Sequence, residues 1–386
     1  MVGRRNDQQY EQKYGPLAIF DISPSVGRSF AQNVCNILGV PLQQINVDKF
    51  RDGETDIKIT ESVRGKDVYV FQSYIPPLGE RLYELQNFLD AVTSGGSASR
   101  VTVVFPYTFG SRGERRTKAR QPIPTLVVAR ALKENGAKKV LTVGIHTTTI
   151  GSTYNAVGIE FEHLEFEHLA ANYILNTAEG NVVIAAPDVG AASRIRRIRK
   201  IIMEEIPAHI RRGINLTLAI ADKYRPAENV AEIWDVVGDV KDKIVYIVDD
   251  IGDTLGTLKE AAKAYRKKGA KKIYVIINHP VLSPGSEQNL TEILANGIVD
   301  EIVFGNTIPL KEFVKNNPKI KIIPIEPFVA EAIRRLHADR SISGLHKYEE
   351  IVRAYQNGAQ ATLQSMEFIS KNVKKESISL ALHLHR

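Results

Sequence analysis

The segment 244–257, IVYIVDDIGDTLGT, combines an apolar stretch with residue types that bind phosphates and hydroxyls. Two carboxylates, Asp249 and Asp250, close the apolar stretch, and the loop that follows adds Asp253, Thr254, Gly256 and Thr257. A helix N-terminus offers unpaired N–H groups and a positive dipole end, which suit a phosphate, and glycine permits close approach. The carboxylates suit hydroxyls or a magnesium ion. Together they describe a ribose 5-phosphate site, and a capped turn with solvated aspartates is the alternative.

A second segment with chemical potential is the basic stretch 112–120, RGERRTKAR, which has five basic residues and one acid. It lacks apolar periodicity, so it predicts a loop. The loop is either a solvated charge run or a cover that folds over a polyphosphate through charge-assisted hydrogen bonds. Aromatic residues do not interleave with its charges, which weakens a nucleic-acid interpretation.

The elements that must position these residues are short, β-branched, apolar runs separated by helical patterns. Runs that are apolar on both faces predict buried parallel strands, and their alternation with helices predicts the α/β class. The strands are expected at 17–20, 67–72, 101–107, 140–145, 181–186, 216–221, 244–248, 272–277, 301–304 and 319–324. A helix is expected from the DDIGDTLGT loop to about Lys268.

An internal repeat bears on domain organisation. The stretches 129–140 and 261–273 both run from an Ala/Lys-rich helix through a glycine and a lysine pair into a strand. The glycine favours a left-handed helix cap. The similarity reflects either two related α/β domains or simply a common way to leave a helix. The two-domain hypothesis places a boundary near 162–169, where EHLEFEHL separates two strand–helix blocks.

The composition excludes several classes of protein. The chain has 386 residues, 51 Lys+Arg against 44 Asp+Glu, a net charge of +7 and one cysteine. A single cysteine excludes an internal disulfide and a zinc site with two thiolates. No apolar run reaches the length of a membrane span, and the polar N-terminus is not a secretory signal. We expect a cytoplasmic protein with neither a membrane nor a nucleic-acid partner.

Further motifs occur in a fixed order along the chain. They are FRDGE at 50–54, ESVRGK at 61–66, FPYTFGSR at 105–112, QPI at 121–123, IHTTTIGSTYN from 145, PDVG at 187–190, DKYR at 222–225, GDVK at 238–241, TIPL at 307–310 and AEAIRRLHADRSISGL at 330–345. With DDIGDTLGT, the set resembles the ribose-phosphate pyrophosphokinase family over about 16–346. The DDIGDTLGT string itself resembles the phosphoribosyl-binding signature of the type I phosphoribosyltransferase fold.

The resemblance implies an enzyme of nucleotide biosynthesis that transfers the diphosphoryl group of ATP to O1 of ribose 5-phosphate, giving 5-phosphoribosyl 1-diphosphate and AMP. It implies Mg²⁺ and a homo-oligomer, dimer-based, with a hexamer as one such form. It also implies two related phosphoribosyltransferase-like domains, each a mostly parallel sheet flanked by helices. We expect an ATP-side domain at 16–164 and a ribose-5-phosphate-side domain at 165–346, whose last helix packs back on the first. A C-terminal extension at 347–386, helical in composition, has no assigned role.

The resemblance also implies roles for single residues. It assigns adenine binding to Phe50, Asp52 and Glu54, and binding of the ATP phosphates to Arg112. It assigns magnesium binding to His146 and Asp188, and catalysis to Lys223 and Arg225. The residues that it assigns to ribose 5-phosphate are Asp188, Asp249, Asp250, Asp253, Thr254, Gly256 and Thr257. ATP binding includes His146 through its magnesium ion. In a strand, residues 223 and 225 point to the same side, as two cations acting on one phosphate chain must.

Three departures from the family pattern keep rival hypotheses open. Gly144 stands where the family usually has an acid two residues before the metal histidine, Gly113-Glu114 replaces Gln-Asp, and Asn155 replaces an acid. Losing carboxylates weakens a magnesium site. The rivals are a catalytically silent regulatory paralogue, a phosphoribosyltransferase, and a basic nucleic-acid-binding protein. The last is supported only by the 112–120 segment.

Overall fold

The computed structural model describes residues 14–24, 28–224 and 233–359. Their contacts divide the chain into two compact units. The N-terminal unit takes its described residues from 1–142, 147–163 and 328–345, and the C-terminal unit from 143–146, 164–327 and 346–386. Each unit therefore contains short segments from the other half of the sequence, and the segment 328–345 of the N-terminal unit includes most of the last helix of the expected range 165–346.

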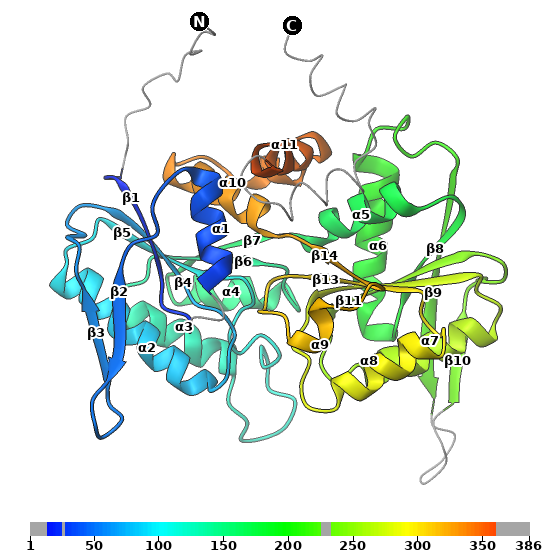
Figure 1. The fold of residues 1–386 in the computed structure, drawn as a ribbon, viewed down its shortest axis with the longest axis horizontal. Helices are drawn as coiled ribbons and strands as arrows, with labels where there is room; N and C mark the ends of the chain where they lie inside the picture. The colour runs from blue at the N-terminus through cyan, green and yellow to red at the C-terminus, as the bar shows by residue number, and fades with distance from the viewer. Residues whose placement is uncertain (1–13, 25–27, 225–232, 360–386) are drawn as a thin grey trace, which may run out of the picture. The chain divides into compact units, whose positions relative to one another are not determined.

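The N-terminal unit is built on a five-stranded sheet in the order β1-β4-β5-β6-β7, in which β1, β4, β5 and β6 pair in parallel (Figure 1). The strands are β1 (Leu17–Asp21), β4 (Asp67–Phe71), β5 (Arg100–Phe105), β6 (Lys139–Val143) and β7 (Glu160–Leu164). The helices are α1 (Arg28–Leu38), α2 (Leu78–Asp90), the π-helical turn η2 (Ala91–Gly95), α3 (Pro124–Glu134) and α4 (Thr149–Ala156). Strands β2 (Ile45–Lys49) and β3 (Thr55–Ile59) form a separate antiparallel hairpin.

The C-terminal unit is built on a seven-stranded sheet in the order β10-β9-β8-β11-β12-β13-β14. The strands are β8 (Gly180–Ala186), β9 (Ile214–Tyr224), β10 (Ile233–Val237), β11 (Ile244–Ile251), β12 (Lys272–His279), β13 (Glu301–Gly305) and β14 (Ile320–Ile323). All pairs are parallel except β9–β10. The other elements are α5 (Phe166–Thr177), η3 (Val189–Ala191), α6 (Ala192–Lys200), η4 (Ile201–Glu205), α7 (Gly256–Lys267), α8 (Ser286–Ala295), α9 (Glu312–Lys315), α10 (Glu326–His337), η5 (Ser343–His346) and α11 (Tyr348–Ala359).

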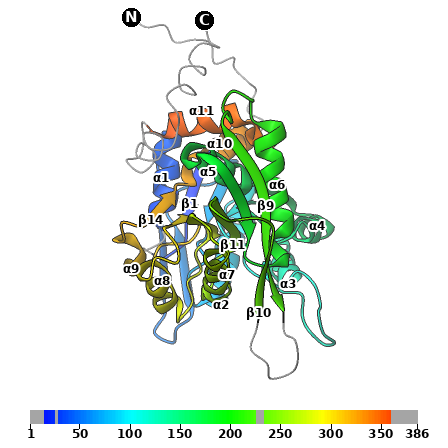
Figure 2. The ribbon, with the colours of Figure 1, turned by 90° about the vertical axis from the view of Figure 1, so that its right-hand side faces the viewer.

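The core of the C-terminal unit explains why its strands are apolar on both faces. Helix α6 covers one face of the sheet, and α7 and α8 cover the other (Figure 2). On the second face, alternate residues such as Val245 and Ile247 of β11 pack with Leu258 of α7 and Leu290 of α8. The intervening residues Tyr246 and Val248 are equally buried. A central parallel strand covered twice must bury both faces, so the prediction of an α/β fold with mostly parallel sheets is confirmed.

Two glycines end helices in the way that the internal repeat predicts. Gly136 follows α3 with a φ of +92°, and Gly269 follows α7 with a φ of +91°. Both backbone conformations are left-handed, which a residue with a Cβ rarely adopts. The two equivalent exits support the interpretation of the repeat as two related units.

The sequence patterns missed three strand features. The hairpin β2–β3 and the antiparallel edge strand β10 were not predicted, and β7 occupies part of the EHLEFEHL stretch, whose remainder begins α5. In the C-terminal extension, α11 is helical, and residues 360–386 lie outside the described part. Within the described ranges, none of the helices has the length and hydropathy needed to cross a bilayer.

A buried ion pair fixes the segment 328–345 in the N-terminal unit. Arg100 of β5 donates from Nε and Nη2 to the two carboxylate oxygens of Asp67 at 2.8 and 2.6 Å. His337 Nδ1 of α10 lies 2.8 Å from Asp67 Oδ2, and Arg100 also donates to the Leu336 carbonyl. The Asp67 side chain is fully buried. Residues that are 270 positions apart therefore share one buried charge cluster.

Candidate active site

Two acidic side chains at the carboxyl end of β11 share one guanidinium. Arg194 of α6 contacts Asp249 Oδ1 from Nη1 at 3.2 Å and Asp250 Oδ2 from Nη2 at 3.0 Å. Its Nε also lies 3.6 Å from a carboxylate oxygen of Glu167 on α5. The Arg194 side chain is only 11% exposed, so its charge is poorly screened by solvent. One cation thus faces three carboxylates.

The ionisation of the two aspartates reflects this excess of negative charge. Burial and the neighbouring charge of Asp250 raise the pKa of Asp249 well above its usual range. Burial also acts to raise the pKa of Asp250, but the hydrogen bond with His146 and the charge of Arg194 hold it below its usual range. A second cation near Asp249 would favour its ionised form. The end of β11 is therefore suited to a divalent cation or to hydroxyl groups.

The structure brings His146 to this acidic pair. His146 lies in the turn after β6, in the segment 143–146 that belongs to the C-terminal unit. Its Nδ1 lies 2.6 Å from Asp250 Oδ2, and its side chain is 42% exposed. The hydrogen bond at Nδ1 fixes the orientation of the imidazole ring at the end of β11. The sequence placed His146 and Asp250 in one site only through the family resemblance, and the structure shows them in direct contact.

The loop from β11 to α7 presents a helix N-terminus. Thr254 and Thr257 are exposed, and a Cβ on Gly256 would lie 3.7 Å from its nearest neighbour, Thr254 Oγ1. Leu255, which precedes α7, has a φ of +64°, a strained conformation for a residue with a Cβ. The first turn of α7 contains no acidic residue. Free N–H groups, two hydroxyls and open space at Gly256 suit a phosphate.

Two other predicted site residues of the C-terminal unit lie near the ends of strands β8 and β9. Asp188, which follows β8, accepts a hydrogen bond from the backbone N–H of Ala191 at 3.2 Å and so caps η3. Lys223 lies near the end of β9, paired with Trp234 of β10. Arg225 lies outside the described residues. The structure thus gives backbone positions for Asp188 and Lys223 and leaves the predicted pairing of Lys223 with Arg225 as a prediction.

The residues assigned to ATP lie in the N-terminal unit, except for His146. The hairpin β2–β3 carries Phe50, Asp52 and Glu54 at its tip, where Asp52 Oδ1 accepts from the Glu54 backbone N–H at 3.0 Å. Phe50 is 55% exposed, unusual for a large apolar side chain. Arg112 is exposed at the start of a loop. Gln121 Oε1 accepts hydrogen bonds from the Thr117 and Lys118 backbone within this loop.

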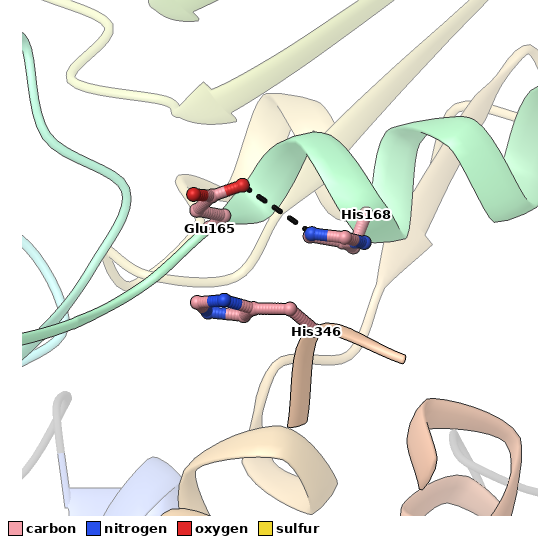
Figure 3. Close-up of side chains that lie close together, drawn as sticks. All are labelled: Glu165, His168 and His346. Atoms are coloured by element: carbon pink, nitrogen blue, oxygen red, sulfur yellow. Dashed lines mark ion pairs between the residues drawn. The ribbon is translucent and has the colours of Figure 1, made fainter. Parts of the chain in front are cut away.

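Sequence reasoning missed a cluster of Glu165, His168 and His346 in the C-terminal unit (Figure 3). Their candidate ligand atoms lie within 4.8 Å of one another, which raises the question of a metal ion. However, Arg197 of α6 donates from Nε to Glu165 Oε2 at 2.8 Å and lies 3.2 Å from His168 Nε2. The two imidazoles stack with an interplanar angle of 10°. The Arg197 guanidinium therefore already supplies a positive charge to this cluster.

The stacking gives a second reason why this cluster is not a metal site as it stands. An imidazole binds a metal along its in-plane nitrogen lone pair. Nearly parallel rings with centroids 5.1 Å apart direct their lone pairs into separate planes, so they do not converge on one ion. We assign the cluster a structural role, in which it ties His346, at the end of η5, to α5. No spacing rule links residues 168 and 346, which explains why the sequence did not reveal it.

Arg194 is the second residue that sequence reasoning missed. It follows the PDVG motif within a run rich in arginine, ASRIRRIRK. One usable signal was the position of Arg194 beside Ile195 and Ile198. These two isoleucines are buried and so mark the face of α6 that packs on the sheet, and an arginine next to that face can reach the sheet.

Two family models match successive parts of the sequence. Residues 19–136 match the family model described as the N-terminal domain of ribose phosphate pyrophosphokinase, and residues 215–347 match the phosphoribosyl synthetase-associated domain. The ribose-phosphate pyrophosphokinase of Campylobacter jejuni is 35% identical over 323 residues, covering 84% of this chain and 97% of the relative. The chain belongs to the ribose-phosphate pyrophosphokinase family. The enzyme of that name from Clostridium perfringens is 36% identical over 318 residues, covering 82% and 93% of the two chains.

A solved structure of the family agrees in fold. The crystal structure of phosphoribosylpyrophosphate synthetase from Mycobacterium smegmatis superposes with a TM-score of 0.73 at 29% identity, covering 84% of this chain and all of the other. The family assignment made from the ordered motifs is therefore confirmed, as is a fold of two related phosphoribosyltransferase-like domains with a C-terminal extension. Helix α11 lies beyond the second family model, which ends at residue 347.

Proposed function

We propose that this chain transfers the diphosphoryl group of ATP to O1 of ribose 5-phosphate, producing 5-phosphoribosyl 1-diphosphate and AMP. The observation that carries the proposal is the grouping at the end of β11, where Asp249 and Asp250 meet His146 beside the open N-terminus of α7. This arrangement offers anionic, hydroxyl-binding groups next to a phosphate-binding helix end, in a chain that belongs to the ribose-phosphate pyrophosphokinase family.

The residues at this site fit a divalent cation, and we propose Mg²⁺. Burial, and after it the charge of Asp250, raises the pKa of Asp249 in spite of Arg194, and a divalent cation would favour the ionised form. Carboxylate oxygens are the ligands that Mg²⁺ prefers. His146 and Asp188 are the residues proposed to hold it. When bound, the ion would neutralise charge on the phosphate chain of ATP.

The chain's own groups bind and orient the substrates. The N–H groups at the start of α7, with the Thr254 and Thr257 hydroxyls, bind the 5-phosphate, and Asp249 and Asp250 bind the ribose hydroxyls. Phe50, Asp52, Glu54 and Arg112 are proposed to bind ATP. Lys223 and Arg225 stabilise charge that builds between the attacked β-phosphorus and the departing α-phosphate, so catalysis consists mainly of positioning and electrostatics.

The exposed Phe50 side chain supports a homo-oligomer as part of this proposal. An exposed aromatic ring at a hairpin tip is well suited to a binding partner or a ligand. In a dimer-based assembly, Phe50 of one copy would contact the adenine ring of the ATP that is bound at the neighbouring copy's site. Light scattering of the purified protein measures this directly, and a strictly monomeric, active enzyme contradicts it.

A direct assay tests the proposed reaction. The protein is incubated with ATP, MgCl₂ and ribose 5-phosphate, and AMP and 5-phosphoribosyl 1-diphosphate are quantified together. Equimolar formation of both products is expected, and the absence of AMP above background contradicts the proposal. Lys223→Ala is expected to lower kcat by about 100-fold or more, because the charge that it neutralises develops in the transition state. An exposed lysine of the same unit, Lys272→Ala, is the matched control.

Gly144 supports a second candidate function. It stands where the resemblance led us to expect an acid, so the metal site has one carboxylate fewer, as a catalytically silent regulatory paralogue would. This candidate predicts ATP and ribose 5-phosphate binding by calorimetry without product formation. Turnover with both substrates excludes it.

A further inference from the structure

A chain of buried hydrogen bonds runs from the end of β13 to the turn that carries His146. The Thr307 hydroxyl donates to the Asn278 carbonyl at 3.0 Å, and His279 Nδ1 lies 2.8 Å from the same hydroxyl oxygen. The Asn278 side-chain amide lies 3.0 Å from His279 Nε2 and donates to the Val143 carbonyl at 3.3 Å. Thr307, His279 and Asn278 are all at most 2% exposed. These three side chains therefore form one contiguous buried polar network.

The hydrogen bonds whose direction is fixed run to backbone carbonyls. The Thr307 hydroxyl donates to the Asn278 carbonyl, and the Asn278 amide donates to the Val143 carbonyl. The His279 ring lies between these groups, and it also hydrogen-bonds to the Gly144 backbone. Asn278 is therefore the residue that connects β12 to the segment 143–146.

Asn278 also packs against Gly144 so closely that there is no room for a Cβ on the glycine. We call this close contact between the two residues the interlock. Gly144 has a φ of +62°, and a Cβ built on it would lie 2.1 Å from Asn278 Nδ2. The Gly144 backbone N–H donates to the Leu164 carbonyl at 2.7 Å. The segment 143–146 is thus held at Val143 by Asn278 and at Gly144 by Leu164, which fixes the direction in which His146 leaves the backbone.

The side-chain oxygen of Asn278 shows that the residue is not placed for stability alone. Within the described part of the chain, the buried Asn278 Oδ1 accepts no hydrogen bond. A buried acceptor that has lost its water partners lowers stability. The amide nitrogen of the same side chain donates to the Val143 carbonyl and contacts His279 Nε2. The arrangement keeps both contacts of the amide nitrogen at the expense of an unsatisfied oxygen.

We propose that Asn278 is a positioning residue for His146. Its amide holds the segment 143–146 so that His146 Nδ1 reaches Asp250 Oδ2 at 2.6 Å, and Gly144 leaves the space that the amide needs. This inference rests on the proposed function only in giving His146 its role. It adds a residue that contacts neither substrate and acts through the histidine.

A double-mutant cycle tests this role. Asn278→Ala is expected to lower kcat by about 10- to 100-fold and to change KM for ribose 5-phosphate by less than about threefold. In a His146→Ala background the same substitution is expected to change kcat by less than about twofold, because no histidine is left to position. Asn172→Ala, at an equally buried asparagine of α5, is the matched control and is expected to leave kcat unchanged. An undiminished loss in the His146→Ala background overturns the proposal.

Two further measurements keep the outcome decisive. If Asn278→Ala does not fold by circular dichroism, Asn278→Ser, which keeps one donor, replaces it in the same cycle. If His146→Ala has no measurable turnover, His146→Gln serves as the background. A wild-type protein that forms no AMP contradicts the proposed reaction but leaves the interlock of Gly144 with Asn278 to be tested by stability.

The interlock is measured by urea unfolding without any substrate. Gly144→Ala is expected to lower the unfolding midpoint strongly, because its Cβ overlaps the Asn278 amide. Asn278→Ala combined with Gly144→Ala is expected to unfold at a midpoint no lower than that of Gly144→Ala alone, since removing the amide relieves the overlap. Additive losses from the two substitutions contradict the interlock.

Discussion

His279 is a buried histidine that must remain neutral in the folded chain. Burial lowers its pKa to about 3, even though the nearby charge of Asp250 acts in the opposite direction. The imidazole therefore does not take up a proton at the pH values at which an exposed histidine does. In the unfolded chain the same ring protonates near its ordinary pKa of about 6.5.

This difference predicts a dependence of stability on pH. A histidine with a depressed folded-state pKa contributes stability that is present above the unfolded pKa and is lost as the pH falls from about 6.5 toward 3. Between pH 7.5 and pH 5 the loss is about 2 kcal/mol of unfolding free energy. Urea unfolding at both pH values measures it. His279→Gln is expected to show a pH dependence smaller by about that amount, and an identical dependence contradicts the assignment.

Arg194 provides a second prediction at the residue scale. Arg194→Met leaves Asp249, Asp250 and Glu167 without their shared cation, and removing one partner of a buried charge cluster costs about 3–5 kcal/mol. MgCl₂ is expected to raise the unfolding free energy of this variant more than that of the wild type, because a bound cation favours the folded state. Arg196→Met, at an exposed arginine of the same helix, is the control. A variant as stable as wild type without magnesium refutes the shared-cation interpretation.

The sequence revealed those site residues that lie close together along the chain and missed those that come from distant elements. Asp249 to Thr257 lie on one strand–loop–helix segment, so their types and spacing indicated phosphate and hydroxyl chemistry directly. Arg194 and Asn278 reach the same region from elements 55 and 28 residues away from Asp249 and Asp250 respectively. Only the strand order β8-β11-β12 brings them there, and no local pattern records that order.

At the scale of elements, the two helix exits show how a single backbone conformation sets a connection. Gly136 and Gly269 both leave a helix with a left-handed φ and lead into a parallel strand, β6 or β12. Their surroundings differ. A Cβ on Gly136 would lie 2.7 Å from Thr93 Cγ2, whereas one on Gly269 would lie 3.3 Å from Lys241 Cγ, a flexible side chain.

Alanine substitutions at these glycines test the element-scale argument. Gly269→Ala is expected to lower the unfolding free energy by about 1–2 kcal/mol through its left-handed backbone. Gly136→Ala is expected to cost more, because of Thr93. Gly79→Ala in α2, where φ is not left-handed and no atom lies within 4 Å of the added Cβ, is expected to stabilise by up to about 1 kcal/mol. Thermal unfolding of the three variants measures the order, and equal shifts contradict it.

The strands that the sequence missed share a physical cause. In the β2–β3 hairpin only Ile45 is buried, and the strands carry charged residues such as Asp48, Asp56 and Lys58. The hairpin therefore lacks the long apolar run by which the central strands were found. Strand β10 is an antiparallel edge strand beside β9. By contrast, β11 and β12 are apolar on both faces because helices cover them twice. Burial on two faces makes a strand conspicuous, and one-sided burial does not.

At the scale of the whole molecule, each unit completes itself with segments from the other half of the sequence. The N-terminal unit includes residues 328–345, anchored by His337 on the buried Asp67–Arg100 pair. The C-terminal unit includes residues 143–146, which carry His146. The division into units is therefore not a division of the sequence at one point.

Asp67→Asn tests how much the buried pair contributes. It leaves Arg100, whose side chain is 8% exposed, without its carboxylate and removes the partner of His337. We expect a loss of about 3–5 kcal/mol of unfolding free energy. Asp235→Asn removes an exposed partner of Lys268 and is expected to change the unfolding free energy far less, because solvent screens this pair. Similar effects of the two substitutions contradict the importance of burial.

The placement of residues 328–345 also governs the order in which the chain can fold during synthesis. The strands of the N-terminal unit leave the ribosome first, but Asp67 and Arg100 meet His337 only after some 270 further residues have been translated. The seven strands of the C-terminal unit are all complete by Ile323, before that segment appears. The unit that is synthesised first therefore completes its buried contacts only when His337 has been made, and the C-terminal unit completes its own later still, with α11. Nascent chains arrested before residue 328 are expected to protect the N-terminal strands from proteolysis less well than the full-length chain does.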